Sequence, residues 1–265
     1  MDVKSSLGII GAGRLAEGLA KTWLARTGKA PVIWSRSGQS GGAVNRISEA
    51  TWVNRWTGTL EAQSVAIAIP GRALLDLVEG NEQARHFKGN VFSAAASLSR
   101  SSLQRLFPQA TIVGIAPFLI DDENSIPMLV LRPSELSDSA WSKVQAELDH
   151  FGDCDVIEDE AVFNQLSLLG SSWPAVVLAA VNAAAGAGVD QLQDNAAIRL
   201  GRRIFFRGLH SLLATCAQKV EHKPASDIAT PGGITERGFQ SLGNVNSLFE
   251  SVFKQMQTRA EELRA

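Results

Sequence analysis

The sequence predicts an α/β domain followed by an all-helical domain. Short apolar runs alternate with amphipathic helical patterns as far as Ile157, and beyond it only helical spacing continues. A glycine-rich turn joins the first apolar run to the first helical pattern. Alternating strands and helices are typical of a doubly wound parallel sheet. We therefore expect an α/β domain over residues 1–157 and a helical domain over residues 158–265.

Eight apolar runs are the expected strands. They cover residues 7–10, 31–34, 51–53, 65–69, 91–93, 111–115, 128–131 and 154–157. Ligands of such sheets bind beyond the carboxyl ends of the strands. The segments expected around one crevice are therefore Gly11–Arg14, Ser35–Ser37, Ile69–Gly71, Ala94–Ala96 and Ala116–Phe118.

Helical patterns occupy the second half of the chain. They run from Glu158 to about Leu169, from Ser172 to Ala187, from Asp190 to Ala217 and from Thr235 to near the end. Residues 161–189 contain no charged side chain, which is long enough for a membrane span. However, this segment contains Asn, Gln, Ser and Pro, and its second half is mostly alanine. We expect it to be buried in a subunit interface and not in a membrane.

Composition excludes several classes of function. A net charge of -2 over 265 residues gives no basic surface for nucleic acid or an anionic membrane. Cys154 and Cys216 are far apart and have neither metal-ligand nor redox spacing, and the histidines are scattered. The first residues lack the apolar core of a signal peptide. We expect a cytoplasmic protein without a bound metal.

The first turn has the Gly-x-Gly-x-x-Ala pattern of a dinucleotide site, between a strand and a helix. Gly11 permits a tight turn, and Gly13 lets backbone amides approach a pyrophosphate. Ala16 keeps the helix close to the sheet. The predicted cofactor contacts in this Rossmann-type turn are Gly11, Ala12, Gly13, Arg14 and Leu15.

The second expected strand ends in Ser35-Arg36-Ser37. An NAD site expects an acidic residue here for the ribose 2′-hydroxyl. A guanidinium between two serines suits a 2′-phosphate instead. We predict that Ser35, Arg36 and Ser37 select NADPH over NADH. Further cofactor contacts are expected at Ile69, Pro70 and Ala95, where later strands end.

A second glycine-rich turn, residues 229–235, precedes the last helical pattern. Thr235 is a plausible N-cap, and Gly232 and Gly233 let neighbouring amides converge. Convergent amides at a helix amino end can hold a carboxylate or a phosphate. Taken alone, the pattern also fits an ordinary surface turn and cap.

Together these features resemble the pyrroline-5-carboxylate reductase family over essentially the whole chain. The motifs that carry the resemblance are the turn 11–16, the strand 66–70, the segment 172–175 and, most specifically, the turn 229–235. That family reduces a cyclic imine acid to proline with NAD(P)H. The resemblance implies an oxidoreductase with an α/β cofactor domain and an all-α dimerisation domain.

The resemblance also implies roles for individual residues. Thr235 would face the substrate ring nitrogen, and Thr230, Gly232 and Gly233 would hold the substrate carboxylate. Ser172, with Trp173 beside it, would line the pocket across the dimer interface. Family members dimerise by interlocking their helical domains. The expected partners are therefore a small cyclic imino acid and a second copy of the chain.

Three segments depart from the family pattern. Ile69-Pro70 stands where Lys-Pro is usual, and Trp173 interrupts the usual Gly-Ser-Gly-Pro segment. Phe118-Leu119 replaces an Asn-Thr pair, which makes the expected crevice more apolar. The reaction type therefore follows from the resemblance more directly than the substrate does.

Two other functions remain open at this point. A hydroxyacid or ketopantoate-type NADP dehydrogenase would share the architecture, but it would need a proton donor such as a lysine near the nicotinamide. Lys219 and Lys223 precede the glycine-rich turn, yet nothing in the sequence places them in the cleft. A non-catalytic, NADPH-binding relative would explain the lost polar residues.

Overall fold

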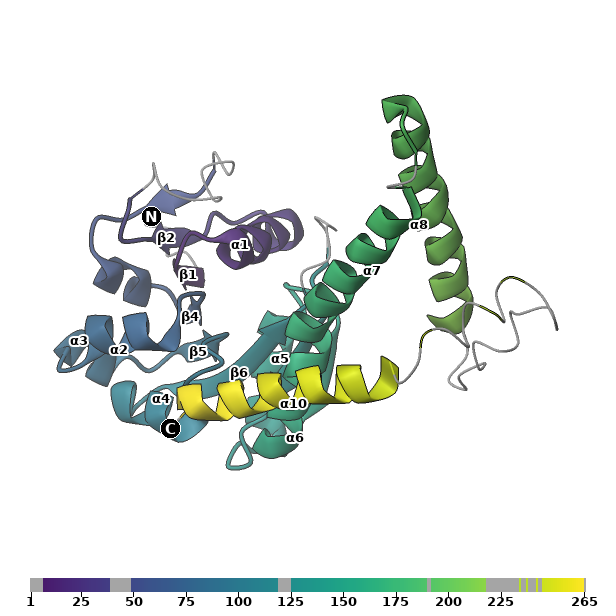
Figure 1. Cartoon of the computed structure of the whole chain (residues 1–265). Helices are drawn as coiled ribbons and strands as arrows, with labels where there is room; N and C mark the ends of the chain where they lie inside the picture. The colour runs from purple at the N-terminus through teal and green to yellow at the C-terminus, as the bar shows by residue number, and fades with distance from the viewer. Residues whose placement is uncertain are drawn as a thin grey trace. The chain divides into compact units, whose positions relative to one another are not determined.

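The computed structural model describes residues 7–38, 49–118, 125–189, 192–217, 234, 237, 242 and 245–264 (Figure 1). The chain divides into two compact units. The first comprises Met1–Ser172 with Met256–Ala265, and the second comprises Trp173–Gln255. The domain boundary expected between residues 157 and 158 coincides with the end of the last strand and stays a prediction.

The first unit contains an eight-stranded sheet with the order β3-β2-β1-β4-β5-β6-β7-β8. Its strands are β1 (Leu7–Ile10), β2 (Val32–Trp34), β3 (Thr51–Trp52), β4 (Ser64–Ile67), β5 (Asn90–Ser93), β6 (Thr111–Pro117), β7 (Met128–Leu131) and β8 (Cys154–Ile157). The predicted fold class is confirmed.

One pairing corrects the all-parallel expectation. β7 runs antiparallel to β6, whereas every other neighbouring pair is parallel. The reason is the length of the connection, residues 118–127, since a parallel crossover needs a dozen residues or more. β7 and β8 therefore run opposite to the other strands.

Helices cover both faces of the sheet. α1 (Arg14–Thr27) and α5 (Asp138–Leu148) pack on one face. The other face is covered by η3 (Trp56–Glu61), α2 (Gly71–Val78), α3 (Glu82–His86), α4 (Arg100–Leu106) and α6 (Glu160–Ser167). Strand side chains alternate between these layers, so that Ile9 packs beneath α1 and Ile10 beneath α2.

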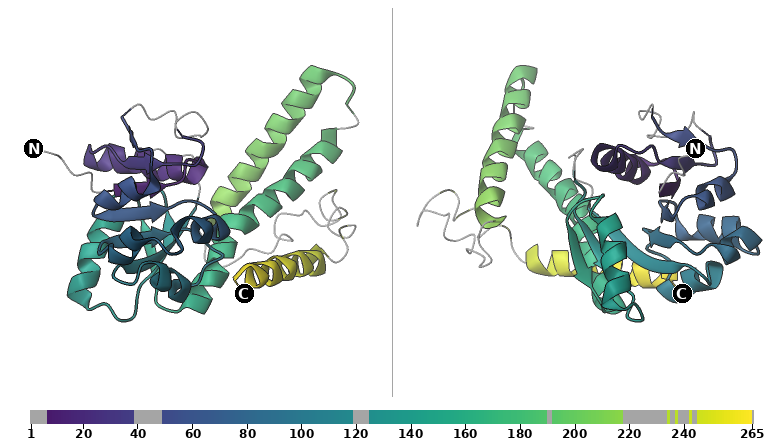
Figure 2. Two further views of the ribbon diagram at one scale, coloured as in Figure 1. Left: turned by 90° about the vertical axis from the view of Figure 1, so that its left-hand side faces the viewer. Right: turned by 180° about the vertical axis from the view of Figure 1, so that it is seen from behind.

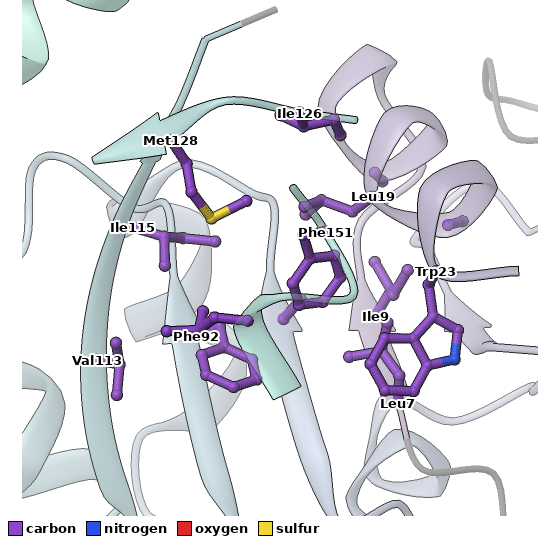
Figure 3. Close-up of a cluster of buried hydrophobic side chains, with 14 of the residues drawn as sticks. Leu7, Ile9, Leu19, Trp23, Phe92, Val113, Ile115, Ile126, Met128 and Phe151 are labelled. Carbon is purple, nitrogen blue, oxygen red and sulfur yellow. The ribbon is translucent and has the colours of Figure 1, made fainter. Parts of the chain in front are cut away.

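The core beneath α1 and α5 is rich in aromatic side chains (Figure 3). Phe151 contacts Trp23 at a ring-centroid distance of 5.5 Å and Phe92 at 5.9 Å. All three are almost completely buried. Because Trp23 and Leu19 belong to α1, this core fixes the helix on the sheet and with it the Gly11–Gly13 turn.

The helical half begins in the first unit with a continuous helical run. α6 passes through a π-helical turn, η4 (Leu168–Ser172), into α7 (Trp173–Val189) without the break that the sequence predicted. The run Glu160–Val189 is long and apolar enough to cross a membrane, by length and composition alone. Only 6% of the most apolar 18-residue stretch of this helical run is buried within the single chain.

In the second unit, α7 packs along α8 (Asn195–Ala217), as Figure 2 shows. Gly201 of α8 lies so close to α7 that an added Cβ would be 2.8 Å from Val189 Cγ1. Ala185 and Val189 are the only buried residues in the described part of this unit. α10 (Val245–Arg264) is the last described helix, and its last residues belong to the first unit.

Candidate functional site

The carboxyl ends of the parallel strands lie side by side along one edge of the sheet. Ile10 pairs with Trp34 on one side and with Ile67 on the other. Ser93 pairs with Ile67 and with Gly114. The five segments predicted to follow these strands are thus neighbours along this edge. The order of the sheet reverses at β1, which is where dinucleotides bind in doubly wound folds.

The turn between β1 and α1 has the geometry that its glycines allow. Gly11 has a φ of 129°, and a Cβ on it would be 2.5 Å from the Ala68 carbonyl oxygen. Its amide donates to the Trp34 carbonyl (2.8 Å), and the Ala68 amide donates to the Ile10 carbonyl (2.9 Å). These two hydrogen bonds tie the ends of β1, β2 and β4 together around the turn.

The amino end of α1 is open. Gly13 is its N-cap residue, forms no side-chain cap and would meet no atom within 4 Å if it carried a Cβ. The first amides of a helix have no partner within the helix, and the helix dipole favours an anion there. Gly13 and Arg14 are exposed, whereas Ala12 and Ala16 are buried and Leu15 is half-buried. This helix end can therefore hold a phosphate.

The end of β2 forms a compact turn. The Gly38 amide donates to the Ser35 carbonyl (3.1 Å), and the Ser35 hydroxyl donates to the Gly38 carbonyl (2.9 Å). Arg36 and Ser37 are exposed on this turn, which follows β2 next to the turn between β1 and α1. No carboxylate occurs between Trp34 and Gly38. The turn therefore offers a cation where an NAD site offers an acid.

The other predicted cofactor residues lie farther along the edge. Ile69 is close to the turn, because its Cγ2 would be 3.2 Å from a Cβ on Gly11. Pro70 is exposed and is the N-cap residue of α2. Ala95 is only 6% exposed, its amide donates to the Ser93 hydroxyl (3.3 Å) and its carbonyl accepts from the Leu98 amide (3.0 Å). Its role in cofactor binding stays a prediction.

Sequence reasoning missed a contact of the C-terminal turn with this edge. The Arg264 guanidinium donates through Nε to the carbonyl of Ala96 (2.9 Å). Leu263 and Arg264 also line a cleft of about 640 Å³ with residues of α2 and α4, among them Arg72 and Arg105. No local pattern could predict this contact, because it joins positions 168 residues apart.

The predicted substrate residues are only partly described. Ser172 is exposed at the end of η4. The Trp173 ring is half-buried and packs edge-to-face on Phe249 (5.8 Å) and Phe253 (5.2 Å) of α10. Thr230, Gly232, Gly233 and Thr235 lie outside the described residues, as does Leu119. The functional roles of all these residues stay predictions.

Metal and thiol chemistry find no support in the described residues. No group of three or more His, Cys, Asp or Glu side chains there could hold a metal ion. Burial, and then the charges of Asp149, Asp153 and Asp155, raise the pKa of the Cys154 thiol to about 12. Cys154 therefore stays protonated at neutral pH and is a poor nucleophile.

Comparisons with known proteins agree with this architecture. Residues 160–263 match the family model described as pyrroline-5-carboxylate reductase dimerisation. A 1-pyrroline-5-carboxylate reductase from Streptococcus pyogenes superposes with a TM-score of 0.79 at 19% identity, over 97% of this chain and 98% of that one. The Plasmodium falciparum pyrroline carboxylate reductase with NADP bound gives 0.78 at 13% identity, over 100% of both chains.

A more distant structure is also similar. An imine reductase from Myxococcus stipitatus in complex with NADP+ has a TM-score of 0.56 at 17% identity, over 97% of this chain and 93% of that one. A comparison with curated protein sequences gives no match. The predicted resemblance to the pyrroline-5-carboxylate reductase family is confirmed. At these identities the solved structures establish the fold, and the helical part carries the family match.

Proposed function

We propose that the protein is a cytoplasmic, homodimeric oxidoreductase that uses NADPH to reduce a cyclic imine acid, either pyrroline-5-carboxylate to proline or a related imine. The observation that carries this proposal is the match of residues 160–263 to the dimerisation domain of pyrroline-5-carboxylate reductases. The residues that precede this segment form a sheet whose strand order reverses at β1, and the amino end of α1 lies open at that point.

The residues at the α1 edge fit a dinucleotide phosphate. The open space over Gly13 leaves room for a pyrophosphate, and Gly11 keeps the chain clear of Ala68. Arg36 would pair with the 2′-phosphate, with Ser35 and Ser37 as further donors. NADPH, when bound, supplies the hydride. The Plasmodium falciparum and Myxococcus stipitatus structures contain NADP or NADP+, which supports this choice.

The protein has little acid–base work to do in this reaction. A cyclic imine is readily protonated, and its carbon then accepts hydride without a strong protein acid. The chain must orient the imine carbon and hold the substrate carboxylate. We assign the carboxylate to Thr230 and to the amides around Gly232 and Gly233, and the ring nitrogen to Thr235. Ser172 would line the same pocket.

The helical half supports a homodimer. α7 and α8 leave large apolar side chains in solvent, among them Leu178 (53% exposed), Leu200 (46%) and Ile204 (60%). A second copy would cover these side chains, as the matched dimerisation model implies. This arrangement would also bury the uncharged segment 161–189, whose apolar composition otherwise suits a membrane.

Removing the hydroxyl of Thr235 tests this function. We expect Thr235→Ala to lower kcat/KM on the imine by one to three orders of magnitude, roughly 1.4 to 4 kcal/mol. NADPH affinity should stay unchanged, because the proposed cofactor residues lie elsewhere. Thr235→Ser is the matched control, since it keeps the hydroxyl. The measurement is NADPH oxidation with a panel of cyclic imines and 2-keto acids.

The same panel separates the competing functions. Wild-type rates in Thr235→Ala would remove this residue from the mechanism. Turnover of 2-keto acids in place of imines would indicate a ketopantoate-type dehydrogenase. Tight NADPH binding without turnover of any compound would indicate a non-catalytic protein. Lys219 and Lys223, the candidate proton donors of a dehydrogenase, lie outside the described residues.

A further inference from the structure

The first unit has a cleft of about 640 Å³ between α2 and α4. The last turn of α10, which belongs to the same unit, completes this cleft through Leu263 and Arg264. Both α2 and α4 begin at the carboxyl edge of the sheet and run away from it. The cleft shares no residue with the predicted cofactor contacts, so it is a separate feature of the unit. Its volume is typical of a small-molecule site.

Positive charge is concentrated along this cleft. The lining includes four arginines and one carboxylate, which are Arg72, Arg85, Arg105, Arg264 and Glu79. This excess is local, because the whole chain has 25 Lys and Arg residues against 27 Asp and Glu residues. The expectation of no basic surface came from the total charge, which does not show how the charges are distributed.

Two of these guanidinium groups are held in place and keep free donors. Arg72 Nε lies 3.3 Å from Asp76 Oδ1, but both side chains are largely exposed, so this pair is weak. Arg264 donates through Nε to the carbonyl of Ala96 (2.9 Å). Because a guanidinium has five N–H donors, one such contact leaves the others available to an anion.

Three segments bring donors together at one end of the cleft, near the carboxyl edge of the sheet. Ser97 directly follows Ala96, whose carbonyl binds Arg264. A Cβ on Gly71 would overlap the Ser97 hydroxyl, although Gly71 does not have a positive φ. Glycine therefore lets this hydroxyl lie against the first turn of α2, next to Arg72. Two guanidinium groups and a hydroxyl thus line the same end of the cleft.

The rest of the cleft has a different character. Glu79 follows Arg72 by seven residues, which places it about 10 Å farther along the axis of α2. The single carboxylate is therefore at the other end. The apolar side chains of the lining are those of Leu75, Val78, Leu98, Leu106 and Leu263. A ligand that fills the cleft would have to cover this hydrocarbon as well as meet the arginines.

We propose that this cleft binds a soluble phosphate monoester with an apolar body. The phosphate dianion accepts hydrogen bonds from Arg72, Ser97 and Arg264, because guanidinium groups match pairs of phosphate oxygens. The body of the ester covers the leucines, which inorganic phosphate would leave in water. This site is independent of imine reduction, since it requires neither the cofactor nor the substrate.

Titration calorimetry with hexyl phosphate tests the site, in an excess of NADPH that occupies the proposed cofactor site. We expect hexyl phosphate to bind at least about tenfold more tightly than inorganic phosphate, because part of its chain leaves water. Hexanol, which lacks the charge, should not bind measurably. Arg72→Gln and Arg264→Gln should each weaken the binding of hexyl phosphate by about tenfold.

Two further variants separate this site from general attraction by charge. Lys143→Gln removes the same charge from α5, on the opposite face of the sheet, and should leave the affinity unchanged. Leu263→Ser should weaken hexyl phosphate by about 3- to 10-fold and leave inorganic phosphate unaffected. Leu263 is 53% exposed, so this change should preserve the fold, and the melting temperature of each variant checks that.

Several outcomes would overturn the inference. These are no binding of hexyl phosphate at millimolar concentrations, equal losses in Lys143→Gln and the arginine variants, and undiminished binding in both arginine variants. Sedimentation with vesicles of phosphatidylcholine and phosphatidic acid provides a separate arm. Binding to these vesicles without binding of hexyl phosphate would indicate a lipid headgroup and contradict a soluble ligand. Because no arm measures turnover, failure of this site leaves the proposed reduction standing, and failure of the reduction leaves this site standing.

Discussion

The two units of the chain differ most in what they bury. In the first unit, every strand from β1 to β7 except β3 contributes buried side chains, and aromatic rings fill the space beneath α1 and α5. In the second unit, only Ala185 and Val189 are buried among the described residues. A helix gains most of its stability from a buried apolar face. The sheet unit supplies that face by itself, whereas the described residues of α7 and α8 leave theirs exposed, as the proposed dimer would require.

The largest effect is expected from a matched pair of leucines. Leu19 of α1 is fully buried, whereas Leu200 of α8 is 46% exposed in the single chain. Leu19→Ala should lower the free energy of unfolding by about 2–5 kcal/mol at any protein concentration. Leu200→Ala should matter only where the dimer forms, because its burial depends on the partner.

Urea unfolding over a hundredfold range of protein concentration measures both variants. Circular dichroism reports the helices, and intrinsic fluorescence reports mainly the sheet unit, which contains five of the six tryptophans. Equal, concentration-independent losses in the two variants would contradict the difference between the units.

A second, smaller effect tests the dimer directly. Ile204 is 60% exposed on α8, and a carboxylate there would be buried in the interface without a partner. We expect Ile204→Glu to weaken dimerisation by about 10- to 100-fold, roughly 1.4 to 2.8 kcal/mol. Sedimentation equilibrium measures the dissociation constant.

The control for this variant is Val156→Glu, which adds the same charge to β8 of the first unit at a position that is 37% exposed. It should leave the dimer intact. An unchanged dissociation constant in Ile204→Glu would remove this face of α8 from the interface. Loss of imine reduction together with dimerisation would support a pocket lined across the interface, as predicted for Ser172.

The contrast between the units also explains how far the sequence could predict the structure. A strand such as β1 or β4 is a continuous apolar run that a glycine or proline ends, so local composition marks it. The direction of β7 depended on the length of one connection. The contact of Arg264 with Ala96 leaves no local signal, because it depends on how distant segments meet.

The π-turn shows a different limit of prediction. Gly170, Ser171 and Ser172 resemble the break between two helices, and the sequence predicted such a break. The structure continues the helix through them as a π-helical turn, in which the hydroxyls of Ser167 and Ser171 donate to backbone carbonyls. The ring of Phe118 packs on the only residue of this turn without a side chain. That fit depends on tertiary packing, which spacing along the chain does not encode.

The smallest expected effect comes from Arg36, and it tests whether the sheet unit alone recognises the cofactor. Arg36 is exposed on the Ser35–Gly38 turn, where solvent weakens its pairing with a 2′-phosphate. We expect Arg36→Ala to weaken NADPH binding by about 5- to 10-fold, roughly 1 to 1.4 kcal/mol, and to leave NADH binding unchanged. Isothermal titration calorimetry with each cofactor measures both affinities.

Repeating the titration in the Ile204→Glu background makes the test sharper. If the sheet unit alone holds the cofactor, the loss caused by Arg36→Ala should be the same in dimer and monomer, since sites without shared contacts are additive. A larger loss in one background would mean that the helical unit or the partner subunit contributes to the NADPH site. An equal loss of NADPH and NADH affinity would refute the 2′-phosphate role of Arg36.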